Sequence, residues 1–514
     1  MTRTDPRSRV VVVTLTPLLA LTLWAGSAPA YETITTHPGL TARAALASTL
    51  HRHLVRSHGE PLGLLAPLRL HPGAMTPRRH RLLWRHLRHL DPAGGYRPDV
   101  ERGQRGLGWI MAGSVLEQMP ASRNRHHFYS PVRRGGLDDR APLMAWTTGL
   151  LAVVEGSDSV RQFLTGAGFD LTGTSALDWV RSADNPLSLD AYHDHVSLAV
   201  QSATPRERRH HLAMSLLAMG ALLHVLQDMA SPTHVRNDFR VGHMQRLGKS
   251  TLFRASAYER YVARTYKQLG LPPPGGKPVR RPTLDAYFSA SDWQGLADLT
   301  SLGHFSPGTV PPPVQVLRRS DPRELRKRLA KRLPLSEPRL GPIDLRCALR
   351  RTCYMKRGGQ PMLAYRITSA RQLEFFLDER CHAAAARRLL PLAQRYSTGL
   401  IDHLLRGAVE PQIEPAEGDE PPRFTVRNTG ARLASGTARL LWEDGTGRRQ
   451  PAGAHAIVAA PRGGELLAVS VEPPADARKL VVIVDGKDQR GERVLATGFV
   501  ELRQDGEASS DDSE

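Results

Sequence analysis

The sequence contains very little cysteine. Its 514 residues include three, Cys347, Cys353 and Cys381, and they are spread too widely to form a zinc knuckle. In an exported chain this odd number allows one disulfide and one spare thiol. The sequence does not show which two would pair, and a structural role is expected for all three.

Aromatic and acidic residues are scarce as well. Aromatic residues make up 6% of the chain. The chain has 50 acidic residues and 70 lysines and arginines, so its formal net charge is +20. The few aromatics form no clear stripe on which nucleic-acid bases could stack. The charge favours anionic partners, such as nucleic acid, phospholipid headgroups or acidic polymers, without selecting one. Because the excess arginine is scattered over the whole chain, compositional bias explains it better than a specific anion site.

One of the few long apolar runs lies at the N-terminus. Three arginines within the first nine residues precede the apolar residues 10–24, and small residues follow up to Ala30. This order is typical of a secretory signal peptide, residues 1–30, whose removal makes Tyr31 the first residue of the mature chain. The alternative is an uncleaved N-terminal anchor. The sequence therefore predicts a secreted or periplasmic protein with no transmembrane helix in its mature part.

A second segment, residues 206–226, has apolar residues at intervals of three and four and ends in potential metal ligands. His224 and Asp228 are four residues apart, so on a helix both side chains project from one face. Pro232 is expected to end the helix, and His234 follows on the bend. Histidine nitrogens and carboxylate oxygens are ligands that zinc prefers. A hydrogen-bonded core pair is the alternative interpretation of His224 and Asp228.

The rest of the chain divides by pattern. Apolar residues recur at intervals of three and four up to about residue 406, which predicts helices, whereas short β-rich runs separated by turn formers at regular intervals indicate a small β-sandwich at the C-terminus. The sequence predicts a mainly α domain over 31–410 with a loop or insertion around 271–345, a linker over 411–422, an all-β accessory domain over 423–504 and a disordered acidic tail over 505–514.

Other segments carry further potential ligands. Glu117 precedes His127 by a short distance, His37 lies near the predicted mature terminus, and Glu259 follows the apolar run. Each of these residues alone is a weak signal, because single surface histidines and glutamates are common. A multinuclear zinc site needs several such segments to meet in space.

The motifs together resemble a known family. The pattern of His224, Asp228, Pro232, His234 and Asn237, combined with the segment 127–131 (His-Phe-Tyr-Ser-Pro), resembles the zinc-dependent bacterial phospholipases C and fungal single-strand nucleases. The resemblance covers roughly residues 31–265, and further short segments extend it toward the end of the helical part. It implies a multi-helix domain that holds two or three zinc ions.

The resemblance also implies a set of site residues. Its metal ligands would be Tyr31, through its amino nitrogen and carbonyl oxygen, and the side chains of His37, Glu117, His127, His224, Asp228, His234 and Glu259. Asp228 would bridge two ions, with His37 on one and His127 and His224 on the other. Glu117 would be the catalytic carboxylate, since Gln118 stands where the family has an aspartate. Ala255 stands where the family has a histidine, so His243 or Asp238 could substitute and a two-zinc site is equally open.

The expected function is phosphoester hydrolysis. The resemblance implies a secreted phospholipase C-like enzyme that cleaves a phospholipid phosphodiester with a metal-activated water, with peripheral membrane contact as a further expectation. Two alternatives stay open. One is a nuclease or 3′-nucleotidase on the same metal core, with nucleic acid as substrate. The other is a catalytically weakened, zinc-stabilised binding protein, suggested by Gln118 and Ala255.

Overall fold

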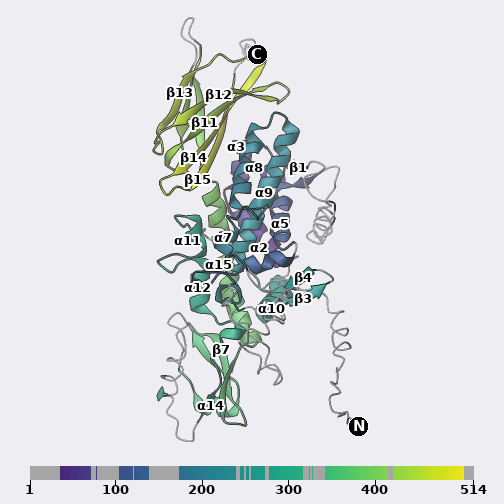
Figure 1. Cartoon of the computed structure of the whole chain (residues 1–514), viewed down its shortest axis with the longest axis vertical. Coiled ribbons are helices and arrows are strands. Elements are labelled where there is room, and N and C mark those ends of the chain that lie inside the picture. The colour runs from purple at the N-terminus through teal and green to yellow at the C-terminus, as the bar shows by residue number, and fades with distance from the viewer. Residues whose placement is uncertain are drawn as a thin grey trace, which may run out of the picture.

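The computed structural model describes most of the mature chain. Described are residues 35–70, 103–119, 121–137, 173–238, 244–247, 250–253, 256–271, 277–316, 342–414 and 421–502, with single positions at 77, 81, 323, 324 and 327. The predicted signal peptide, Tyr31, Ala255 and the acidic tail lie outside these residues. The molecule is elongated, with a β-sandwich at one end, helices in the middle and a small sheet at the other end (Figure 1).

The helical part is built around α9 (Pro205–Asp228). Thr204 caps it, because its side chain accepts from the backbone of Glu207 while the Glu207 carboxylate accepts from Thr204, and Pro205 occupies the first turn. Among the described helices, α9 is the one long and apolar enough to cross a membrane, but 83% of its apolar window is buried inside the protein. It is therefore the core helix of this part. It ends at Asp228, four residues before Pro232.

Helix α5 (Gly106–Leu116) crosses α9 at a contact between backbones. A Cβ atom added to Gly220 would lie 2.0 Å from the Ile110 carbonyl oxygen, and one added to Gly113 would lie 2.0 Å from the Leu217 carbonyl oxygen. Only glycine permits this approach at both positions. The crossing brings the end of α5 beside the ligand-bearing end of α9.

Further helices complete one continuous apolar core around this pair. The main ones are α2 (Thr36–Ala47), α3 (Leu50–His58), α7 (Ala176–Trp179), α8 (Leu189–Gln201), α10 (Ala257–Thr265) and α15 (Glu379–Leu404). Short 3₁₀ turns connect them: η1 (Gly63–Leu65), η2 (Ala121–His126), η4 (His234–Arg236) and η6 (Tyr266–Gln268). Two small two-stranded sheets lie between them as well, one of β1 (Pro67–Leu68) with β2 (Gln104–Arg105) and one of β3 (Met244–Leu247) with β4 (Ser250–Phe253).

The region predicted to be a loop or insertion is partly structured, which corrects that prediction. Its described residues include α11 (Leu284–Phe288), α12 (Leu296–Gly303), η7 (Pro307–Thr309), β5 (Val314–Gln315) and the start of α14 (Leu345–Arg350). Both α11 and α12 pack on α15. The prolines before residue 283 prevent regular helix or strand there. The apolar residues that follow contain fewer prolines and form short helices.

The predicted mainly α domain also contains a sheet that the sequence interpretation missed. Strands β5, β6 (Cys353–Arg357), β7 (Gln360–Ile367) and β8 (Gln372–Phe376) form a four-stranded antiparallel sheet in the order β5-β8-β7-β6. Gly358 and Gly359 turn β6 into β7 with φ values of 55° and 79°. Such a Gly-Gly pair is a recognised hairpin signal, so the hairpin of β6 and β7 could have been predicted from the sequence.

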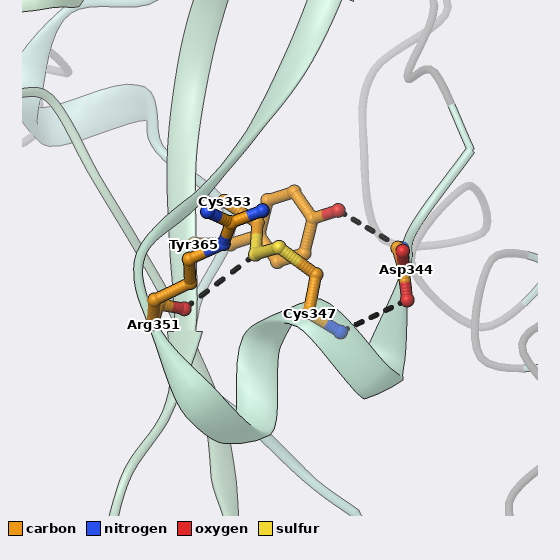
Figure 2. The surroundings of a disulfide bond; sticks show 5 residues. All are labelled: Asp344, Cys347, Arg351, Cys353 and Tyr365. Carbon is orange, nitrogen blue, oxygen red and sulfur yellow. Dashed lines mark hydrogen bonds between the residues drawn. A yellow bond between two sulfur atoms is a disulfide. The ribbon is translucent and has the colours of Figure 1, made fainter.

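The structure resolves which cysteines pair. Cys347 on α14 and Cys353 on β6 form a disulfide beside Tyr365 (Figure 2). The Tyr365 hydroxyl accepts a hydrogen bond from the backbone of Asp344 at 2.9 Å. Cys381 is the free thiol, and it is buried. The disulfide therefore fastens α14 to the edge of the small sheet.

The C-terminal part consists of two antiparallel sheets. One has the order β13-β10-β9 and the other β12-β11-β14-β15. Their strands are β9 (Val409–Glu414), β10 (Arg423–Asn428), β11 (Leu433–Asp444), β12 (Arg449–Ile457), β13 (Glu465–Ser470), β14 (Ala477–Asp488) and β15 (Arg493–Glu501). Phe424 of one sheet meets Trp442 of the other edge-to-face, with ring centroids 5.5 Å apart. The predicted linker over 411–422 is corrected at its start, because residues 411–414 belong to β9, which pairs with β10.

The four-stranded sheet packs directly on the helical part. Strand β14 contributes Leu480, Val482 and Val484 to the sandwich core, whereas Val481 and Ile483 face Val200 of α8. A strand buried on both faces needs an unbroken apolar run, which explains residues 480–484. The sandwich and the helical part therefore share an apolar interface as well as a chain connection.

Candidate metal centre

Asp228 lies at the centre of a buried group of histidines. Its Oδ2 atom is 2.9 Å from His127 Nδ1, 3.2 Å from His224 Nε2 and 3.8 Å from His234 Nδ1, and its Oδ1 atom is 3.3 Å from His37 Nε2. The Asp228, His37, His127 and His224 side chains are fully buried, and that of His234 is 3% exposed. Residues from four separate segments thus meet around one carboxylate.

His37 reaches the carboxylate from α2, and Gln227 fixes its orientation. The His37 Nδ1 atom lies 2.9 Å from Gln227 Oε1. Gln227 Nε2 donates to the hydroxyls of Thr41 and Ser397, which requires its oxygen to face His37. His37 therefore donates through Nδ1, and in its neutral form the lone pair of Nε2 points at Asp228 Oδ1.

His224 has the same arrangement. Its Nδ1 atom donates to the Ser114 carbonyl oxygen at 2.6 Å, so the Nε2 lone pair of the neutral ring faces Asp228 Oδ2. The Gln118 amide nitrogen lies 3.3 Å from the same Nε2 atom. The imidazole rings of His37 and His224 stack with centroids 3.8 Å apart. Two imidazole lone pairs and one carboxylate thus converge on a small buried volume.

His127 connects Asp228 to Glu117. Its Nδ1 atom bonds Asp228, and its Nε2 atom lies 3.4 Å from Glu117 Oε1. Glu117 also accepts hydrogen bonds from Trp179 Nε1 at 2.7 Å and from Arg123 Nη2 at 2.7 Å. Arg123 is held in turn by Asn185 at 2.6 Å. Glu117 therefore sits behind His127, on the side away from Asp228.

This placement differs from the role expected of Glu117 as metal ligand and catalytic carboxylate. Burial alone would raise its pKa, but the charge of Arg123 and the hydrogen bonds from His127 and Trp179 lower the pKa to about 2. An ionised carboxylate paired with an arginine is a poor base. The geometry assigns Glu117 the orientation of His127, as a carboxylate commonly supports the outer nitrogen of a metal-bound histidine.

His234 and Glu259 form the next pair of the group. His234 Nδ1 donates to the His127 carbonyl oxygen at 2.9 Å, and its Nε2 atom lies 3.2 Å from Glu259 Oε1. Ser231 donates to the same carboxylate oxygen at 2.6 Å, while the other oxygen accepts from the backbone of Ser256 and caps α10. The Glu259 carboxylate therefore caps the N-terminus of α10 and also contacts the buried His234.

The electrostatics follow from this network. Burial alone would raise the pKa of Asp228, but His234, His224 and His37 and the hydrogen bond from His127 hold it well below its usual value. Burial would lower the pKa of His234, but Asp228 and Glu259 raise it to about 9. The carboxylates are thus ionised at neutral pH, and a metal ion on His234 would have to displace a proton from this ring.

His224 behaves in the opposite way. Burial, followed by the charges of His37 and His127, outweighs the nearby Asp228 and lowers the pKa of His224 to about 3. A neutral imidazole is the form that binds a metal ion. Its Nε2 lone pair and Asp228 Oδ2 are both acceptors, yet they lie 3.2 Å apart. Two facing acceptors repel each other unless a donor or a cation lies beside them, and the Gln118 amide nitrogen, 3.3 Å from His224 Nε2, is one such donor.

The donor set therefore fits a metal ion. One ligand atom each from His37, His224 and Asp228 lies within 4.8 Å of the other two, and all three residues are buried. Among the described residues, none donates a hydrogen bond to Asp228 Oδ1, although this atom is buried. Two imidazoles and a carboxylate are the ligand types that suit zinc.

The structure brings together six of the eight residues expected from the sequence to be ligands. His37, His127, His224, Asp228, His234 and Glu259 meet in this group, Glu117 stands behind it, and Tyr31 lies outside the described residues. The supporting residues Gln227, Arg123, Trp179 and Ser231 were missed. Gln227 and Ser231 carried a local signal, because both lie within the motif between His224 and His234, whereas Arg123 and Trp179 reach the site through folding alone.

Comparison with known proteins adds little to this geometry. No protein-family model matches the sequence, and no curated protein matches it. Among solved structures, the alpha toxin from Clostridium absonum is similar at 11% identity and a TM-score of 0.25, over 93% of this chain and all of the toxin chain. The chain has an α part, a β part and a buried histidine and aspartate group that could hold a metal ion.

Proposed function

We propose that this protein is a secreted or periplasmic, zinc-dependent phosphoester hydrolase with a phospholipase C-like activity on a phospholipid phosphodiester. The observation that carries the proposal is the convergence of His37 Nε2, His224 Nε2 and Asp228 on one buried volume, with each outer imidazole nitrogen already held by a hydrogen bond. Outer partners of this kind orient the histidines of metal sites. A core histidine pair without a ligand function would not need facing acceptors.

The residues of the group would have different roles in metal binding. His37, His224 and Asp228 would hold an ion, with His127 and the pair of His234 and Glu259 as the donors for a second or third ion. Asp228 presents Oδ1 to His37 and Oδ2 to His127 and His224, so it can bridge two ions. When bound, zinc supplies Lewis acidity and a water acidic enough to act as a nucleophile at neutral pH. Glu117 and Arg123 keep His127 in place.

The phospholipid substrate rests on the sequence resemblance, and two features accord with it. The predicted signal peptide would export the chain to where lipid surfaces are accessible. The sandwich packs firmly on the helical part through β14, so it could present the active site to a surface at a fixed orientation. Hydrolysis of nucleic acid on the same metal core is the second candidate, because a net charge of +20 favours a polyanionic substrate.

Metal analysis and paired activity assays test the proposal. The purified mature protein should contain about two or three zinc ions per chain and should hydrolyse phosphatidylcholine, with activity lost to a chelator and restored by zinc. Faster hydrolysis of single-stranded DNA would select the nuclease candidate. A protein that contains fewer than about two zinc ions, or is inactive on both substrates with zinc bound, would contradict the hydrolase.

Substitutions separate the ligands from other buried histidines. His224→Ala and Asp228→Ala should each remove bound zinc and lower activity by several orders of magnitude, because a ligand is lost. His193→Ala is the matched control, since His193 is also buried, 3% exposed, but belongs to α8 and the sandwich interface. Zinc content at the wild-type level in His224→Ala would show that this residue is not a ligand.

A further inference from the structure

A cavity of about 140 Å³ lies between the helical part and the sandwich, far from the histidine group. Its walls come from the end of α3, the first turns of α9 and the strands β11, β12, β14 and β15. Figure 1 shows α3, α8 and the sandwich side by side at this end of the molecule. Arg208 in this wall and His224 in the metal centre are separated by ~24 Å along α9, at a rise of about 1.5 Å per residue.

The walls of the cavity carry more positive than negative charge. Its lining includes the cations Arg208, Arg209, Arg449 and Lys479 and only two carboxylates, Glu60 and Glu443. A further carboxylate, Glu501, pairs with Lys479 from outside the lining, at 72% exposure. Glu443 Oε2 is shared between two guanidiniums, at 3.3 Å from Arg208 and 2.7 Å from Arg449. One carboxylate therefore compensates two arginines.

Some of these donors are already used to join the two parts of the molecule. Arg449 Nη1 donates to the Val200 carbonyl oxygen at 2.6 Å, and Arg208 donates to the carbonyl oxygens of Ala203 and Gly447. These bonds fix the guanidinium planes without neutralising their charge. The positive charge of the wall is thus built into the interface.

Other donors are left over. Among the described residues, no acceptor bonds Arg449 Nη2, although the Arg449 side chain is only 10% exposed. Arg209 uses Nε for Glu60, and its two terminal nitrogens have no acceptor within the described part of the chain. Arg209 is 56% exposed, so it lies where solvent reaches the cavity. None of these nitrogens is a fully buried atom without a partner, so they are open to solvent, and the cavity is large enough for several water molecules or a small anion.

The charges already disturb one another. Burial, the neighbouring Arg449 and then Arg209 lower the pKa of Arg208 to about 10 despite the presence of Glu443. Burial, followed by the charges of His53 and Arg449, lowers the pKa of His58 to about 3, so this imidazole stays neutral at the cavity wall. A negative ligand would relieve this repulsion.

We propose that this cavity is a binding site for a small oxyanion of the phosphate class, held by Arg209 and Arg449 at the junction of the helical part and the sandwich. Guanidinium N–H groups are strong donors to phosphate, and here Arg209 offers its two terminal nitrogens while Arg449 offers Nη2. Because both parts of the molecule contribute a donor, bound anion should stabilise their contact. The site does not depend on the metal centre.

Binding of inorganic phosphate to the full chain tests this proposal. Calorimetry and thermal unfolding are measured in phosphate against chloride at equal ionic strength, for the wild type and for Arg209→Gln and Arg206→Gln. Arg206 is exposed on the same turn of α9 but does not line the cavity, so it is the matched control. Arg209→Gln should weaken phosphate binding about tenfold, the loss expected for one charge-assisted contact. Arg206→Gln should bind as the wild type does.

A second pair of variants removes the buried donor. Arg449→Gln should weaken binding at least as much as Arg209→Gln, whereas the exposed neighbour Arg448→Gln should not. If Arg449→Gln does not fold, the comparison of Arg209→Gln with Arg206→Gln still tests the proposed anion site. Glycerol phosphate and vesicles with phosphatidic acid identify the source: binding of the soluble ester alone indicates a free phosphate ligand, and vesicle binding lost in Arg209→Gln indicates a lipid headgroup.

Either of two outcomes would overturn the proposal. If phosphate stabilises the wild type no more than chloride does, or if Arg209→Gln and Arg206→Gln bind it equally, the cavity is not an anion site. Phosphate held only at the metal centre would give this second result, because neither arginine lies there. A negative result for phosphate binding at this cavity therefore does not contradict the proposed hydrolase. The absence of zinc or of hydrolase activity likewise does not contradict the proposed anion site.

Discussion

At the scale of single residues, the site is defined by which atom of each imidazole faces inward. His37 and His224 use Nδ1 for a glutamine oxygen and a backbone carbonyl, so their Nε2 atoms face Asp228. His127 instead presents Nδ1 to Asp228 and gives Nε2 to Glu117. The outer partners therefore decide the tautomers, and with them the side of each ring that can bind a metal ion.

The pair of Arg123 and Glu117 should be costly to break. Arg123→Gln leaves the carboxylate of Glu117 buried without its main counter-charge, so the free energy of unfolding should fall by about 3–5 kcal/mol at pH 7. Urea denaturation measures the change. Arg123→Gln combined with Glu117→Gln should recover part of the loss, since no buried charge is then unpaired. A double variant less stable than Arg123→Gln alone would mean that the pair is not coupled in this way.

At the scale of elements, the metal centre depends on the crossing of α5 and α9. Glu117 follows the end of α5, and His224 and Asp228 occupy the last turn of α9. The distance between these helices is set by Gly113 and Gly220, whose missing side chains let the backbones touch. A small change in this distance would move ligands on both helices relative to each other.

Gly220→Ala should therefore affect stability and metal binding together. The added methyl group would lie 2.0 Å from the Ile110 carbonyl oxygen, a backbone atom that cannot turn away. We expect a loss of about 3 kcal/mol in the free energy of unfolding and weaker zinc binding, because overpacking forces the helices apart. Gly303→Ala in α12 is the control, since nothing lies within 4 Å of its added Cβ atom. Equal effects of the two substitutions would show that the crossing is not tight.

At the scale of the whole molecule, the fold joins its three parts through buried polar groups as well as apolar surfaces. His193 of α8 lies at the junction with the sandwich, near Arg493 and Arg406, and His304 lies near the small sheet, beside Arg388, Arg236 and Arg357. Burial first, and these arginines second, lower the pKa of each histidine to about 3. Both imidazoles are therefore neutral in the folded protein above that pH.

Stability should consequently fall on mild acidification. The unfolded chain takes up protons on these histidines near pH 6.5, whereas the folded protein does not, so the unfolded state binds more protons and gains relative stability as the pH falls. The loss is about 2 kcal/mol per histidine between pH 6.5 and pH 5, at about 1.36 kcal/mol per pH unit. Denaturation in chelator measures it without a contribution from metal binding. His304→Gln should lose less unfolding free energy on acidification than the wild type does. His51→Gln, at an exposed site, should lose as much as the wild type.

Some of the fold was determined by local sequence. The periodic apolar residues within 206–226, the capping box of Thr204 and Glu207 and the ligand motif at the end are sufficient to predict α9 and the pairing of His224 with Asp228 on one face. The regular β-rich runs after residue 423 predict the strands of the sandwich. Local patterns succeed here because helix caps, periodicity and turn residues act within a few positions of the chain.

Other features needed the tertiary structure. Nothing local distinguishes Glu117 as a ligand from Glu117 as the partner of Arg123, because Trp179 and Asn185 come from a distant segment and settle its role. The same holds for β9, whose strand pairing with β10 replaces the predicted linker at residues 411–414. Residue types and their spacing along the chain predict which residues could bind a metal ion. Only the fold decided which of their atoms face one another, since that depends on long-range packing and on the hydrogen bonds it completes.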